Sequence, residues 1–231
     1  MILRLRGEVK MIPLRRKLAD GRLLEGAALE VYIPARRGAR HYADSFSCAL
    51  ALAKQLPDYG QQWAWDMAAD LAALVPVECD AIACPPASRR RIAADFYFAR
   101  ELACAAVECL TGDPSDGRGG REVHLCRPLR WAREEIVGAG AAKEIMHQGG
   151  QGRKLGREVE CLEVLTGRRV CLVDDMFTTG ITAALTAEAL YRAGAEGVHV
   201  VTLGATERTE HRPAEERERL RWRAEVRRVR R

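Results

Sequence analysis

The sequence predicts an α/β protein with an open, parallel sheet flanked by helices. Short apolar runs at residues 170–173 and 198–203 enclose a stretch of helical periodicity at residues 183–193. A strand–helix–strand unit of this length is a βαβ unit, whose two strands lie parallel. The 231 residues, of which 48% are hydrophobic and 30% charged, fit one such domain with decorations.

The first 75 residues are expected to form a small, partly helical N-terminal part. Residues 29–34 read as a short strand, and residues 42–56 carry apolar side chains at helical spacing. Pro57 to Gly60 has the composition of a turn. A second helix is expected over residues 63–74, ending before Pro76.

The core is expected over residues 76–206. Residues 79–84 predict a strand that ends at Pro85, and residues 89–110 have helical periodicity. Residues 122–126 predict another short strand. Residues 128–158 show little periodicity, and long loops in compact domains are usually functional or disordered. Residues 207–231 are expected to form a charged helix or tail.

Composition and charge limit the cellular location and the kinds of partner that we expect for this protein. No run approaches the roughly 18 to 20 apolar residues of a membrane span, and the N-terminus has no secretory pattern, so we expect a cytoplasmic protein. The net charge of +5 is concentrated in residues 207–231, whose ten Arg and six Glu give +4. This tail could contact nucleic-acid backbone, but its interleaved glutamates favour pairing within a helix.

Eight cysteines and five histidines are scattered along the chain. No Cys-x-x-Cys pair occurs, and the spacing of Cys79/Cys84 and of Cys104/Cys109 is not that of a zinc finger. We therefore expect free thiols and no metal bound directly by the protein.

The segment Val170-Cys-Leu-Val-Asp-Asp-Met-Phe-Thr-Thr-Gly-Ile-Thr182 carries the chemistry. A buried strand is expected to end before Asp174 and Asp175, at the edge where open α/β sheets bind ligands. A loop would follow and open a helix whose backbone N–H groups and positive end suit a phosphate. The two carboxylates suit the hydroxyls of a ribose. The residues expected at the 5′-phosphate are Thr178, Thr179, Gly180, Ile181 and Thr182.

A simpler interpretation is that this segment is only the end of a strand, followed by residues that cap the next helix. One Asp and one Thr would satisfy the helix N-terminus. Two acids and a complete Thr-Thr-Gly-x-Thr run exceed what capping requires, so ligand binding is favoured.

The same thirteen residues resemble the phosphoribosyl pyrophosphate (PRPP) signature of the type I phosphoribosyltransferases, and the Asp-Asp-x-x-Thr-Thr-Gly-x-Thr form is closest to the ComF-type branch. The resemblance implies a phosphoribosyltransferase-like open sheet with a variable N-terminal hood, here residues 1–75. It assigns Asp174 and Asp175 to the ribose hydroxyls as catalytic residues. The four-cysteine zinc ribbon common in that branch is absent here, because the first cysteine is Cys48.

The resemblance also implies two further elements. The pyrophosphate loop would lie about ninety residues upstream, after residues 79–84. Its candidate residues are Pro86, Ala87, Ser88 and Arg89. The Arg-Gly-Phe-Asn expected beyond this loop appears only as Ala94-Asp-Phe-Tyr97. A mobile loop that closes over the substrate would fall within residues 127–157, where the candidates for contact with pyrophosphate are Lys143, Arg153 and Lys154.

We therefore expect a protein that binds PRPP or a ribose 5-phosphate-containing nucleotide and transfers phosphoribosyl to or from a nitrogen base with Mg²⁺. The alternative is a non-catalytic binding protein, regulatory or accessory to DNA uptake or repair. A homodimer is common among the proteins that this chain resembles.

Overall fold

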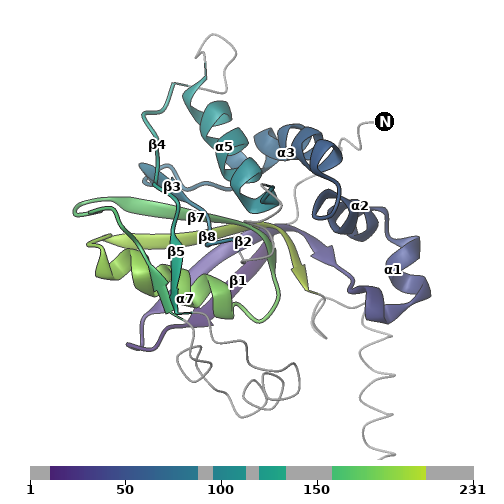
Figure 1. Cartoon of the computed structure of the whole chain (residues 1–231), viewed down its shortest axis with the longest axis horizontal. Helices are drawn as coiled ribbons and strands as arrows, with labels where there is room; N and C mark the ends of the chain where they lie inside the picture. The colour runs from purple at the N-terminus through teal and green to yellow at the C-terminus, as the bar shows by residue number, and fades with distance from the viewer. Residues whose placement is uncertain (1–10, 88–95, 113–119, 134–157, 207–231) are drawn as a thin grey trace, which may run out of the picture.

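The computed structural model describes residues 11–87, 96–112, 120–133 and 158–206. A six-stranded sheet of order β1-β2-β8-β7-β3-β4 runs through the molecule, and every neighbouring pair is parallel except β1 and β2 (Figure 1). The prediction of an open, mostly parallel sheet flanked by helices is confirmed. The elements are β1 (Ile12–Lys17), β2 (Leu23–Tyr32), η1 (Ala35–Arg37), α1 (Ala39–Ala43), α2 (Ser45–Ala53), α3 (Pro57–Ala72), β3 (Ala81–Ala83), α5 (Phe98–Thr111), β4 (His124–Leu125), β5 (Arg130–Arg133), β6 (Glu158–Glu160), β7 (Arg169–Phe177), α7 (Ile181–Arg192) and β8 (Gly197–Thr206).

The first strands of the chain belong to the main sheet. β2 pairs in parallel with β8, and β1 adds an antiparallel edge strand. The boundary expected at residue 75 therefore does not coincide with a break in the sheet. The turn expected at Pro57 is wrong, because Pro57 is the first residue of α3, a position where its fixed φ and missing N–H suit a helix.

Helices α2, α3 and α5 cover one face of the sheet (Figure 1). Leu50, Leu71, Phe98 and Leu102 are fully buried there. The Trp63 ring stacks on Phe98, with centroids 5.8 Å apart and planes 12° apart. Burying several large side chains, each contributing about 1.5–3 kcal/mol, fixes this helical layer on the sheet.

Helix α7 covers the opposite face, together with the two-stranded sheet of β5 and β6 (Figure 1). Leu190, Leu172 and Val200 are fully buried between α7 and the sheet. The 128–158 segment, which shows little periodicity, contains β5 and the first residue of β6, although residues 134–157 lie outside the described part. Among the described helices, none is long and apolar enough to cross a membrane.

The strand order places a topological switch between β3 and β7. After β3 the chain goes to the α5 face and on to β4, whereas after β7 it goes to α7 on the other face and on to β8. Connections that leave two parallel neighbours toward opposite faces leave a crevice at the carboxyl ends of those strands, and open α/β sheets bind ligands there. Asp174 and Asp175, near the carboxyl end of β7, lie at this point.

Candidate functional site

β7 extends further than the sequence indicates. The expected loop from Asp174 is wrong in its first part, because the strand continues to Phe177, with Asp174 opposite Thr202 and Phe177 opposite Ala205 of β8. Both acids therefore lie on rigid backbone. Since neighbouring side chains of a strand point to opposite faces, the two carboxylates meet different surroundings.

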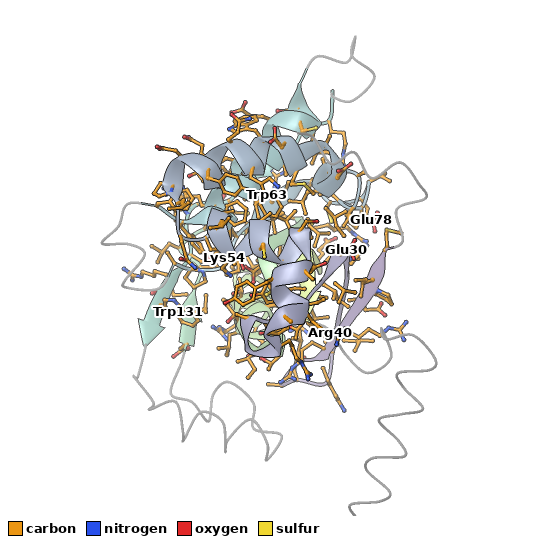
Figure 2. All side chains as sticks on the ribbon, turned by 90° about the vertical axis from the view of Figure 1, so that its right-hand side faces the viewer. Glu30, Arg40, Lys54, Trp63, Glu78 and Trp131 are labelled. Carbon is orange, nitrogen blue, oxygen red and sulfur yellow. The ribbon has the colours of Figure 1, made fainter. Side chains whose placement is uncertain are left out.

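Asp175 is buried, with only 6% of its surface exposed. Its Oδ1 lies 2.8 Å from Nζ of Lys54, the C-cap residue of α2. Burial raises the pKa of the Tyr32 hydroxyl at the end of β2, and the nearby charge of Asp175 raises it further. Asp175 is thus held among α2, β2 and β7 (Figure 2 labels Lys54).

Asp174 is half-buried and lies beside the end of β3. Its Oδ1 accepts a hydrogen bond from the backbone N–H of Asp175 at 2.8 Å. Burial raises the pKa of the Cys84 thiol to about 12, and the charge of Asp174 adds to the effect. The carboxylate of Asp174 therefore lies close to the strand end from which the pyrophosphate loop is expected to begin.

Gly180 shapes the loop between β7 and α7. Its φ of 71° lies in the left-handed region, which disfavours other residues. A Cβ at this position would lie 2.4 Å from the ring of Phe177, which is itself buried. Only glycine satisfies both conditions, so the tight turn that begins α7 depends on this residue.

The N-terminus of α7 has no side-chain cap among the described residues. The first helical hydrogen bond runs from the N–H of Ala184 to the carbonyl oxygen of Gly180, at 2.9 Å. The N–H groups of Ile181, Thr182 and Ala183 precede it and have no acceptor within the helix. Thr178 and Thr179 are exposed beside them, and Thr182 is half-buried. The structure thus brings together all five residues predicted for the phosphate.

The predicted pyrophosphate loop is described only in part. Pro86 is buried and Ala87 half-buried, just beyond the end of β3, which is the neighbour of β7. Ser88 and Arg89 lie outside the described residues. The same holds for Lys143, Arg153 and Lys154 of the predicted mobile loop. The roles of these residues stay predictions.

Sequence reasoning missed Lys54 and Tyr32. Lys54 follows an apolar helix in the N-terminal part and lies 121 residues from its partner Asp175. A lysine at a helix C-terminus is favoured by the helix dipole alone, so its position gives no signal of a distant carboxylate. Only the packing of α2 on the sheet brings the two together.

Comparisons with known proteins give a distant likeness. No protein-family profile matches the chain, and no curated protein matches it. Among solved structures, the crystal structure of a purine phosphoribosyltransferase from Pyrococcus horikoshii Ot3 matches over 76% of this chain and 78% of that chain. The two sequences are 16% identical, and the TM-score is 0.30.

Proposed function

We propose that this protein binds a phosphoribosyl compound, PRPP or a nucleotide, in the crevice between the carboxyl ends of β3 and β7. One observation carries the proposal. Two carboxylates at the end of β7 are followed directly by a helix N-terminus that no described side chain caps. An anion site beside hydrogen-bond acceptors for a diol matches the two ends of a ribose 5-phosphate.

The phosphate would bind at the start of α7. The N–H groups of the first turn, which have no acceptor within the helix, donate to its oxygens, and the partial positive charge of the helix end stabilises its negative charge. The hydroxyls of Thr178 and Thr179 are exposed and can add further donors. The left-handed turn at Gly180 directs the chain so that these donors converge.

The ribose would lie against the carboxylates. Asp174, half-buried beside the end of β3, is the acceptor nearest the crevice. Asp175 has Lys54 as its partner at 2.8 Å, so it accepts a ribose hydroxyl only by sharing or exchanging that partner. We therefore assign the larger part of diol binding to Asp174, and a supporting part to Asp175.

The proposed reaction transfers phosphoribosyl between pyrophosphate and a nitrogen base, as the resemblance to the ComF-type branch implies. The protein would position the substrate and stabilise the leaving pyrophosphate. Mg²⁺ would bind chiefly to oxygens of the substrate, and the Asp174 carboxylate offers the hard oxygen ligand that this ion prefers. We assign the ion no further protein ligand.

Binding of PRPP with and without Mg²⁺, measured by calorimetry, tests the site. Asp174→Asn is expected to weaken binding about tenfold to a hundredfold, since a hydrogen bond to a charged group contributes about 1.5–3 kcal/mol. Asp80→Asn is the matched control, because Asp80 precedes β3 at the opposite end of the sheet, where it pairs with Arg168. Unchanged binding by the Asp174 variant would remove the proposed site.

A second candidate function is binding without turnover. The Lys54–Asp175 ion pair favours it, because the lysine neutralises one of the two carboxylates that the transfer reaction would use. Release of pyrophosphate from PRPP with a panel of purine and pyrimidine bases separates the two functions. Tight binding of PRPP without release for any base would establish the non-catalytic function.

A further inference from the structure

Three side chains with metal-ligating atoms converge at the β4 edge of the sheet. They are His124, Cys126 and Glu163, whose ligand atoms all lie within 4.8 Å of one another. Nε2 of His124 lies 2.5 Å from Oε1 of Glu163. His124 is exposed, Glu163 is half-buried and Cys126 is buried, so the cluster reaches from the surface into the core. We name these three residues the β4 cluster.

The backbone fixes the β4 cluster from two sides. The N–H of His124 donates to the carbonyl oxygen of Asp80, and the N–H of Cys126 donates to that of Ile82, at 2.9 and 2.8 Å. Glu163 is held by the N–H of Arg127, which donates to its Oε2 at 2.8 Å. Two ligands therefore come from a strand paired to β3 and the third from the segment before β7, and a small movement of side chains would bring all three around one ion.

We propose that the β4 cluster binds a zinc ion. Imidazole nitrogen, thiolate sulfur and carboxylate oxygen are all common zinc ligands, and a sulfur ligand disfavours Mg²⁺ and Ca²⁺. Three protein ligands leave a fourth tetrahedral position, which water takes from the exposed side at His124. The backbone N–H of Arg127, which donates to Oε2 of Glu163, provides the outer hydrogen bond that commonly orients a ligating carboxylate.

Zinc at the β4 cluster would join two parts of the chain that the sheet alone does not connect. β4 has only two residues and pairs only with β3 among the described strands. The segment carrying Glu163 precedes β7. Its Leu165 is buried in the core that also contains Cys126, and Cys161 packs against that core. The ion would hold this edge of the sheet to the segment that carries Glu163. It would lie one strand away from the crevice between β3 and β7. The proposal is therefore independent of phosphoribosyl binding.

Zinc uptake by the full chain tests the proposal. Protein purified without metal is titrated with Zn²⁺ against a chromophoric chelator, and with Co²⁺ to detect a sulfur-to-cobalt absorption band. We expect one ion per chain and a sulfur-to-cobalt band. Cys126→Ser is expected to abolish the band. His124→Gln and Glu163→Gln are expected to lower zinc affinity by about tenfold or more, since even outer hydrogen-bond partners contribute about 10–100-fold.

Cys161→Ser is the matched control. Cys161 lies near the β4 cluster, where its Sγ donates to the carbonyl oxygen of Glu163 at 3.5 Å, but it is not one of the three converging ligands. This variant is expected to keep both the ion and the band. Circular dichroism of the metal-free variants tests whether each still folds, and Glu163→Gln preserves the shape of its side chain.

Two outcomes would overturn the zinc proposal. The first is wild-type protein that takes up no zinc. The second is equal loss of metal in Cys126→Ser and Cys161→Ser, which would indicate binding by unspecific thiols. Binding of PRPP by the same variants is measured separately, and its loss or retention leaves the zinc result unchanged.

Discussion

Two carboxylates of this protein each contact a side-chain nitrogen from a distant part of the chain, in different surroundings. Asp175 contacts Lys54, and Glu163 contacts His124. Asp175 and Lys54 keep only 8% and 21% of their side-chain surface exposed. Glu163 and His124 keep 18% and 41%. Removing one partner of a buried ion pair is costly because a buried charge remains, and this applies to Asp175 and Lys54. Breaking the Lys54–Asp175 pair is thus expected to destabilise the fold, whereas the His124 imidazole lies nearer to solvent, where another ligand can reach it.

The largest effect is expected from Lys54→Met. Removing the ammonium leaves the Asp175 carboxylate buried without this partner, and we expect the free energy of unfolding to fall by about 3 kcal/mol. This lies at the lower end of the usual range because Lys54 retains some exposure to water. Urea denaturation at neutral pH measures the change.

The double variant Lys54→Met with Asp175→Leu is the control. Replacing both members of a buried pair by apolar residues is often neutral or stabilising. We expect it to recover most of the loss. A double variant as unstable as Lys54→Met alone would show that packing of the lysine chain, and not the charge of Asp175, determines the effect.

A smaller effect is expected from Gly180→Ala. The left-handed φ alone costs about 1–2 kcal/mol, and the contact with the Phe177 ring adds to it, so we expect a loss of about 2 kcal/mol. Gly167→Ala is the matched control, since its φ of 80° is similar but its Cβ would meet nothing within 4 Å. Equal losses in the two variants would exclude a role for Phe177.

The smallest of the three effects concerns His199 of β8. It is a dependence of the free energy of unfolding on pH, at acid pH. Burial lowers its pKa from the usual 6.5, and the charges of Glu78 and Glu25 only partly oppose this. The unfolded chain therefore binds its proton more readily, so stability is complete above about pH 6.5 and decreases as the pH falls below it. Denaturation of His199→Gln at several pH values should show a weaker decrease. A slope equal to that of the wild type would assign the decrease to other groups.

The local structure of the segment proposed to bind phosphate could be predicted because its residues are contiguous. An apolar run, two acids and a Gly-containing loop occupy thirteen consecutive positions, and local rules of strand, turn and helix formation arrange them. The boundary between strand and loop was misplaced, since β7 continues to Phe177. That extension depends on pairing with β8, and pairing between strands is not encoded in the segment itself.

Contacts between distant segments could not be predicted in the same way. The two members of the β4 cluster that are closest in sequence, His124 and Cys126, form only a His-x-Cys pair. Glu163 comes 37 residues after Cys126. The sequence therefore indicated no metal ligand set. Lys54 and Asp175 are 121 residues apart. In both cases the partners meet because strands and helices pack side by side, which requires knowledge of the strand order.

The hydrogen bond from the backbone N–H of Asp175 to the carboxylate of Asp174 connects the proposed crevice to the helical layer. The N–H of Asp175 donates to Asp174, and the carboxylate of Asp175 holds Lys54 at the end of α2. Only one peptide unit and one side chain separate the Asp174 carboxylate from that helix. A ligand that draws Asp175 away from Lys54 would release the end of α2, and a displacement of α2 would alter the position of Asp174. Ligand binding in the crevice and the position of α2 would then be coupled.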